Sequence, residues 1–265
     1  MSVKNYSMNN NKGFSLIELA IVLLIISILI GSFVGTLGTR IENTYRSDTF
    51  DQLNKIRDAV LGFAISNGRI PCPAIATSGG QESPVGGGNC NEQHGFVPGG
   101  TLGLRGSYNR DSLLLDSWGN PIRYSVTAAN ANAFTTIGGM KAITMAALTP
   151  NLVICDSDTA DDTDIVCIPD TKVTGIVPFV IISLGKDGDS FTGVAKADSD
   201  QQENSGEVLA AKNAAGEDIE YLVGNDIVFV SKTYNRIEAT YFDDLIVWES
   251  PYVLYSKMIE AGQLP

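Results

Sequence analysis

Glu18 is a carboxylate in a place where a carboxylate is costly. It is the one charged residue in residues 14–34, where nearly all other side chains are apolar. The run is long enough to cross a bilayer as one helix, which takes about 20 residues. A charge at mid-bilayer costs roughly 2.5–3.5 kcal/mol on insertion scales. A plain anchor gains nothing from this cost, so we expect Glu18 to meet a group of opposite charge.

The residues before this run indicate its direction in the membrane. Lys4 and Lys12 precede it, with no acidic residue between them. Basic residues tend to stay in the cytoplasm, so the rest of the chain is expected on the other side of the membrane. A cleaved secretory signal fits less well, because its apolar core is usually 7–15 residues long.

Four cysteines could form disulfides or hold a metal: Cys72, Cys90, Cys155 and Cys167. They are even in number, widely spaced and lack a C-x-x-C pair, which fits two disulfides in an oxidising compartment. Three pairings are possible, and pairing of nearest neighbours is the simplest. Zinc is disfavoured, because paired ligand spacing is missing and His94 is the only histidine.

The sequence shows no sign of catalysis or of nucleic-acid binding. The net charge of −12 repels phosphate backbones, so nucleic acid is not an expected partner. His94 is expected in a loop, and no G-x-S-x-G, phosphate-loop or dinucleotide motif accompanies it. We therefore predict that the protein is not an enzyme.

The apolar run is predicted to continue as an amphipathic helix. Phe50, Leu53, Ile56 and Val60 recur at spacings of three and four, which is typical of one buried helical face. Asn67-Gly68 is a natural helix stop. The spacing therefore predicts one helix over about residues 15–66.

The sequence pattern after this helix predicts an α+β domain. Residues 69–104 are rich in Gly and Pro, and we expect a long ordered loop that a Cys72–Cys90 disulfide would close. Strands are predicted in β-branched segments, and a short helix in residues 250–265. The expected sheet is antiparallel, with four or five strands packed on the second half of the long helix. The strand segments are residues 120–128, 151–156, 177–185, 226–233 and 245–248.

Residues 12–31, KGFSLIELAIVLLIISILIG, resemble the N-terminus of type IV pilins and type II secretion pseudopilins. The resemblance implies a leader peptide, residues 1–13, that prepilin peptidase removes after Gly13, followed by methylation of the new N-terminus at Phe14. Glu18 would then pair with the Phe14 amine of a neighbouring subunit and set the register of assembly. This pairing supplies the opposite charge that Glu18 requires.

The same resemblance implies an architecture and a role. Residues 14–35 would form the transmembrane and filament-core helix, residues 36–67 its amphipathic continuation, and residues 68–265 an extracytoplasmic globular domain. The role would be structural: a subunit, minor because of its size, that is inserted in the inner membrane. It would assemble with other pilin subunits on an inner-membrane platform into a pilus or a secretion pseudopilus. The sequence leaves open whether it serves a pilus, a secretion pseudopilus or a DNA-uptake apparatus.

Two internal segments also resemble pseudopilin segments. They are DSWGNP, with Asp116, Trp118, Gly119 and Pro121, and SLGKDG, with Ser183, Gly185, Asp187 and Gly188. In some pseudopilins the loop after the second segment binds calcium, for which Asp187 and Asp189 are the candidates, with Asp198 or Asp200 as further ligands. A plain Asp-Gly turn without metal is the alternative. Apart from calcium, no cofactor is expected.

Other acidic residues and other functions remain as alternatives. The acidic run at residues 156–164 fails the EF-hand pattern and is expected to be a solvated loop between cysteines. The protein could instead be an adhesin or binding module carried on a pilus. It could also be a membrane-anchored calcium-binding protein that never polymerises.

Overall fold

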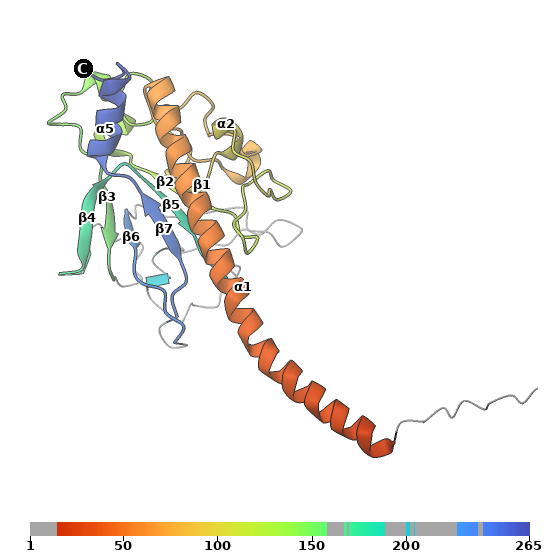
Figure 1. The fold of residues 1–265 in the computed structure, drawn as a ribbon. Coiled ribbons are helices and arrows are strands. Elements are labelled where there is room, and N and C mark those ends of the chain that lie inside the picture. Colours follow the sequence, from red (N-terminus) through yellow and green to blue (C-terminus); the bar gives the residue numbers. More distant parts are fainter. Residues whose placement is uncertain are drawn as a thin grey trace, which may run out of the picture. The chain divides into compact units, whose positions relative to one another are not determined.

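Figure 1 shows a computed structural model of the chain. It describes residues 15–157, 167–168, 170–188, 200–201, 204, 227–237 and 241–265, with only the backbone for residues 31–37. Contacts divide the chain into two compact units, residues 1–44 and residues 45–265. The second unit is called the head unit below, and the two are described separately.

Helix α1, Leu16–Asn67, is the longest element. Within the head unit its buried stripe recurs at three- and four-residue spacing, as the sequence predicts. Phe50 is an exception: it was predicted to belong to the stripe but is 46% exposed. The helix ends where Gly68 adopts a φ of +69° and its N–H bonds to the carbonyl of Ala64 at 2.9 Å. Glycine takes this left-handed conformation without steric cost. The predicted helix over residues 15–66 is confirmed to within one residue at each end. The buried stripe consists of Leu53, Ile56, Val60 and Ala64.

Four antiparallel strands form the sheet that packs on this stripe (Figure 1). Tyr124, Phe179 and Val247 of this sheet share one hydrophobic cluster with the buried residues of α1. This sheet confirms the predicted α+β class, and three of its strands fall in predicted segments. The strand order is β1 (His94–Phe96), β2 (Arg123–Val126), β5 (Phe179–Ser183) and β7 (Leu245–Trp248).

A second sheet of three strands packs against the first and was not predicted as a separate layer. Its central strand pairs antiparallel with one neighbour and parallel with the other. Val180 and Ile182 of the first sheet pack with Leu152 and Phe229 of the second. The first sheet is therefore covered on both faces, which explains why β5 is apolar without alternation. The strand order is β4 (Lys172–Val177), β3 (Leu152–Cys155) and β6 (Val228–Val230).

The C-terminal helix α5, Pro251–Glu260, confirms the helix predicted in residues 250–265. Ser250 caps its N-terminus and Pro251 occupies its first turn, both of which favour a helix start. Leu254 and Met258, four residues apart, are buried in the cluster shared with α1. α5 therefore extends the core beside the end of α1 (Figure 1).

The Gly-rich segment contains more structure than a loop. It forms a one-turn helix η1 (Ala76–Ser78), strand β1 and a short helix α2 (Gly99–Leu102). Strand β1 pairs with β2, and β4 pairs with β3, and neither β1 nor β4 was predicted. The remaining short elements are α3 (Ala129–Asn132) and η2 (Met140–Ala142).

Candidate functional site

The predicted processing site lies at the N-terminal edge of the described residues. Gly13 and Phe14, the expected cleavage and methylation positions, lie outside them. Glu18 is exposed in the first turn of α1. Its Oε2 accepts a hydrogen bond of 3.1 Å from the N–H of Ser15, and Ser15 Oγ accepts one of 3.2 Å from the N–H of Glu18. This reciprocal pair is a capping box, which satisfies two N–H groups at the helix start. We did not anticipate it, although S-x-x-E is its sequence signature.

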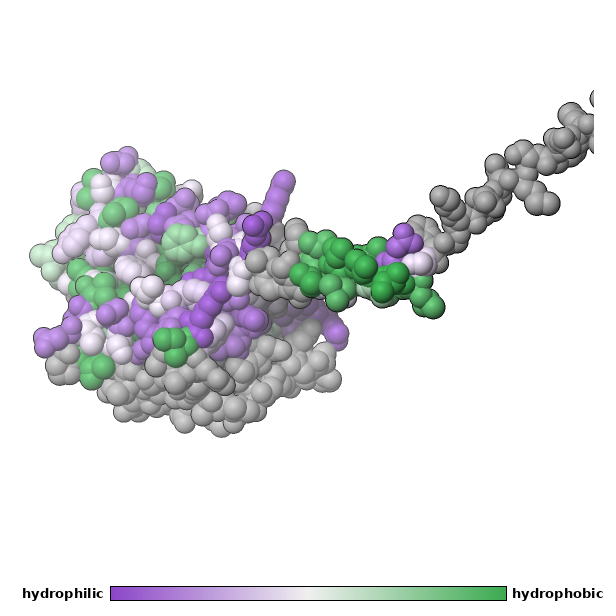
Figure 2. All heavy atoms as spheres, turned by 60° about the horizontal axis from the view of Figure 1, so that its bottom comes forward, coloured by the Kyte–Doolittle hydropathy of each residue, from purple (hydrophilic) through white to green (hydrophobic). Residues whose placement is uncertain are grey.

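The first turns of α1 expose a dense apolar surface (Figure 2). The large aliphatic side chains from Leu16 to Ile30 are between 43% and 90% exposed. None of the helices within the described residues has the length and hydropathy needed to cross a membrane. The predicted span, residues 14–35, includes Phe14 and the side chains of residues 31–37, which lie outside the described part. Exposed aliphatic area on this scale is unfavourable in water, so lipid or protein must cover it.

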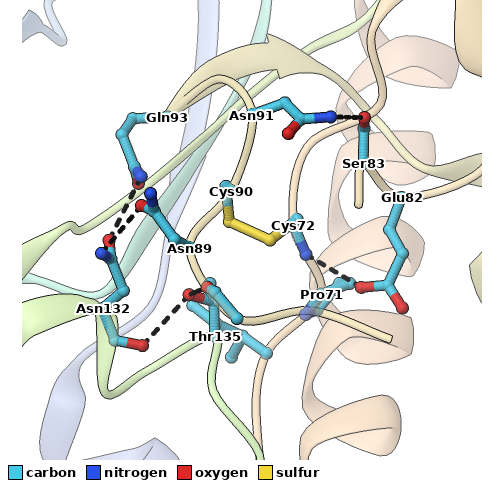
Figure 3. Close-up of a disulfide and its surroundings, with 12 residues drawn as sticks. Pro71, Cys72, Glu82, Ser83, Asn89, Cys90, Asn91, Gln93, Asn132 and Thr135 are labelled. Carbon is cyan, nitrogen blue, oxygen red and sulfur yellow. Dashed lines mark hydrogen bonds between the residues drawn. A yellow bond between two sulfur atoms is a disulfide. The ribbon is translucent and has the colours of Figure 1, made fainter. Parts of the chain in front are cut away.

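The Cys72–Cys90 disulfide closes the Gly-rich segment (Figure 3). Both cysteines are buried, and their Cα atoms are 5.4 Å apart. Beside them Asn91 Nδ2 donates a hydrogen bond of 2.7 Å to Ser83 Oγ. The structure thus contains the nearest-neighbour pairing of these cysteines, and the segment is packed into the core.

A buried ion pair, which sequence analysis missed, holds the same segment. Arg69 contacts Glu82 through two hydrogen bonds, Nη1 to Oε2 at 2.7 Å and Nη2 to Oε1 at 2.6 Å. Both side chains are 4% exposed. The same carboxylate accepts the main-chain N–H groups of Cys72 and Gly86, each at 3.1 Å. Nothing in the local sequence identifies this pair, because Arg69 and Glu82 are brought together only by the path of the loop.

The second disulfide, Cys155–Cys167, joins the end of β3 to the segment before β4. Asp156 beside it is exposed. The other aspartates of the acidic run lie outside the described residues, so the expected solvated loop stays a prediction. Those aspartates are Asp158, Asp161, Asp162 and Asp164.

His94 corrects one expectation. It lies in strand β1 and is 6% exposed, so the prediction that it is a loop residue is wrong. Its Nδ1 lies 2.9 Å from Ser125 Oγ, and burial lowers the pKa of the imidazole to about 4. A neutral imidazole enclosed by the core is inaccessible to a substrate, so this Ser–His contact is a structural one.

The two segments that resemble pseudopilins lie against each other. Ser183 Oγ donates a hydrogen bond of 2.6 Å to Asp116 Oδ2, and Asn120 Nδ2 donates one of 2.6 Å to the carbonyl of Gly185. Burial raises the pKa of Asp116, while the bond from Ser183 opposes this effect. These contacts fix the turn after β5, which carries Asp187.

This turn places Asp187 in a cluster of three carboxylates with Asp243 and Asp244. One carboxylate oxygen from each residue lies within 4.8 Å of the others. The last two precede β7 and are 1% and 4% exposed, respectively. Gly185 has a φ of +64°, and a Cβ there would lie 2.5 Å from the carboxylate carbon of Asp243. The approach of the two segments therefore depends on glycine.

Hydrogen bonds converge on Asp243. Its Oδ2 accepts the main-chain N–H of Lys186 at 2.5 Å and the hydroxyl of Tyr241 at 3.0 Å. Its Oδ1 accepts Nε2 of Gln201 at 2.9 Å. Burial, followed by the charges of Asp187 and Asp244, raises the pKa of Asp243 to about 7. Three carboxylates this close require a bound cation or a shared proton.

Of the other predicted calcium ligands, Asp200 alone lies within the described residues, and it is not in this cluster. Asp189 and Asp198 lie outside the described residues. Asp200 instead pairs with Lys232 and accepts a hydrogen bond of 2.9 Å from Ser157. Asp243 and Asp244 were missed as ligands because they are remote in sequence from Asp187, and only the fold joins them.

The N-terminal part of the chain matches a known family. Residues 8–34 match the family described as the prokaryotic N-terminal methylation motif, a range that includes Gly13, Phe14 and Glu18. No curated protein and no solved structure matches the chain at a significant level. The motif is the hallmark of the processing signal of type IV pilins and pseudopilins. The N-terminal segment of this chain therefore carries a pilin-like methylation signal, as its sequence predicts.

Proposed function

We propose that this protein is a structural subunit of a type IV pilus or a type II secretion pseudopilus, and not an enzyme. The observation that carries the proposal is the methylation motif at residues 8–34, which includes the start of α1 and its exposed apolar surface. A subunit of such a filament requires two parts: a processing motif, and a helix whose apolar surface is buried against lipid or other subunits.

Processing follows from the motif. Prepilin peptidase cleaves after Gly13, and the amine of Phe14 is then methylated. Residues 14–35 hold the subunit in the inner membrane, with the leader in the cytoplasm because Lys4 and Lys12 precede the apolar run. The remainder faces the periplasm. The two disulfides support this compartment, because disulfides persist where the environment is oxidising.

Assembly uses the apolar surface and Glu18. Apolar side chains from Leu16 to Ile30 leave lipid and pack against the same helix of other subunits. The Phe14 amine of a neighbour offsets the charge of Glu18, so only the correct axial stagger avoids a buried unpaired charge. The inner-membrane platform is the site of this transfer. Removal of residues 1–13 leaves 252 residues, a size that favours a minor subunit.

The carboxylate cluster supports calcium as a structural ligand. Calcium takes six to eight oxygen ligands at 2.3–2.6 Å, and carboxylates are its usual protein ligands. Asp187, Asp243 and Asp244 supply such oxygens from two segments. The residues therefore fit the ion, which would neutralise their mutual repulsion and join the turn after β5 to the start of β7.

The N-terminus of the purified protein tests the function. We expect mass spectrometry of surface filaments sheared from cells to find a peptide that begins with N-methylated Phe14. A Gly13→Leu variant should keep the leader and be absent from filaments, because a bulky side chain obstructs the peptidase. A protein that begins only at Met1 would rule out the proposal. A processed peptide found in membranes but never in filaments would favour the anchored, non-polymerising alternative.

A further inference from the structure

Two arginines converge on Tyr234, which lies in the connection between β6 and β7. The guanidinium of Arg46 lies 3.9 Å from the centre of the tyrosine ring, and that of Arg236 lies 5.3 Å from it. Arg236 Nε also donates a hydrogen bond of 2.8 Å to the hydroxyl of Tyr234. Two like charges beside the same ring repel each other, so the arrangement favours the approach of an anion.

The same connection carries an exposed aliphatic side chain in a fixed position. Asn235 and Phe242 exchange main-chain hydrogen bonds of 2.9 and 3.0 Å, and Phe242 is 1% exposed. Asn235 Oδ1 accepts the N–H of Ile237 at 3.0 Å. Ile237 is nevertheless 66% exposed, and Arg236 beside it is exposed as well. An aliphatic side chain next to a cation suits the boundary between lipid headgroups and acyl chains.

Chain length places this patch near the membrane. Arg46 is the second residue of the head unit and follows residue 35, the end of the predicted span, by eleven positions. Both lie in α1, so at most about 17 Å of helix separates them. The headgroups extend about 5–7 Å beyond the hydrocarbon core on each side, and a tilt of α1 would bring the patch closer. The membrane surface is therefore a partner within reach.

The charge of the patch differs from that of the whole chain, which is −12. The neighbouring carboxylates of Asp243 and Asp244 are 1% and 4% exposed, whereas Arg236 is exposed, so an approaching surface meets the arginine first. Arginine binds phosphate through paired hydrogen bonds. We propose that Arg46, Arg236 and Ile237 form a contact with the phosphate groups of anionic phospholipids in the membrane that holds residues 14–35. This inference rests on the membrane insertion proposed above.

Hydrogen exchange on the full-length protein in lipid nanodiscs tests this contact. Phosphatidylglycerol in the nanodisc, compared with phosphatidylcholine alone, should slow amide exchange in residues 231–237 by about fivefold, the factor that corresponds to the attraction of one arginine to an anionic surface. The slowing should disappear at high salt, which screens exposed charges. Residues 122–126, which include strand β2, should be unaffected.

Matched variants assign the effect to the patch. Arg236→Gln removes the exposed charge and should lose the slowing. Ile237→Ser removes the aliphatic contact and should reduce the slowing. Arg110→Gln is the control, because Arg110 is an exposed arginine in a different turn, between Tyr108 and Leu114. It should keep the full response. Exchange in residues 122–126 checks that each variant is folded.

The outcomes distinguish the separate claims. The contact alone is overturned if exchange does not respond to phosphatidylglycerol, or if Arg236→Gln keeps the full response. It is also overturned if inorganic phosphate slows exchange equally in neutral micelles, which would show binding of a free anion. Slowing that follows the number of protein copies per nanodisc, and not lipid charge, would assign the patch to a neighbouring subunit instead. Failure of the chain to enter nanodiscs would overturn the membrane insertion and this contact together.

Discussion

The carboxylate of Glu18 accepts a hydrogen bond from the N–H of Ser15, and the hydroxyl of Ser15 accepts one from the N–H of Glu18. Glu18 therefore has a role within a single subunit, as a helix cap, in addition to its proposed pairing with the Phe14 amine of a neighbour. The two roles make different demands. The cap requires an acceptor, whereas the pairing requires a negative charge.

Glu18→Gln separates these roles, because glutamine also completes a capping box. We expect the variant to insert and to be processed normally. Its incorporation into filaments should fall by more than about tenfold, because loss of one partner of a buried ion pair costs about 3–5 kcal/mol. Quantitative mass spectrometry of sheared filaments measures this. Asp51→Asn, a neutralised exposed carboxylate on the same helix, is the control. Normal incorporation of Glu18→Gln would assign Glu18 to capping alone.

Features with a local sequence signal were predictable. The end of α1 follows from Asn67-Gly68, and α5 follows from Ser250-Pro251 and the spacing of Leu254 and Met258. The methylation motif at residues 8–34 likewise lies within one short segment. In each case neighbouring residues alone determine the structure.

Features that depend on distant pairing were not predictable. β1 has only three residues and lies in a Gly-rich segment, so its strand character comes from pairing with β2. The second sheet requires β3 and β6 to pair in parallel across a long connection. The carboxylate cluster joins Asp187 to Asp243, and the FDDL sequence around the latter resembles an ordinary surface turn. No periodicity in the sequence indicates such contacts.

The Arg69–Glu82 pair should be strongly coupled. Arg69→Met leaves a buried carboxylate without its cation, and we expect it to lower the free energy of unfolding by about 3–5 kcal/mol. In the double variant Arg69→Met/Glu82→Gln the charge is gone while an acceptor remains for the N–H of Cys72. It should recover at least about 1 kcal/mol relative to Arg69→Met. Chemical denaturation of the full-length protein in detergent measures both, and a double variant less stable than the single one would contradict this account.

The Cys72–Cys90 disulfide should stabilise the head unit substantially. The cysteines are 18 positions apart, and closing a loop of this size contributes about 3 kcal/mol by restricting the unfolded chain. We expect the free energy of unfolding of the Cys72→Ala/Cys90→Ala variant to be lower by that amount. The variant should therefore unfold at a lower denaturant concentration. Reduction of the wild type under the same conditions is the companion measurement. An unchanged midpoint would show that packing alone holds the segment.

His94 should make the protein sensitive to mild acid. Its pKa is about 6.5 in an unfolded chain and about 4 in the fold, so the fold favours the neutral form. This contribution is fully present above pH 6.5 and is lost as the pH falls from 6.5 towards 4, by roughly 3 kcal/mol in total. His94→Gln removes the chain's only imidazole and keeps a partner for Ser125. The free energy of unfolding between pH 7 and pH 4.5 should therefore fall less in the variant than in the wild type. Parallel curves would show that His94 does not titrate in this way.

Substitutions can test which carboxylates bind calcium: those predicted from the sequence, or those of the cluster that the fold brings together. Asp243→Asn and Asp244→Asn each remove one charged ligand of the cluster, and we expect each to weaken calcium binding by more than about tenfold. Asp200→Asn is the matched control, because Asp200 pairs with Lys232. Calorimetry on the full-length protein in detergent, with intact disulfides as a check of folding, gives the affinities. If Asp200→Asn lowers the affinity and Asp243→Asn does not, calcium binds elsewhere, and the short distances among the three carboxylates require a shared proton instead.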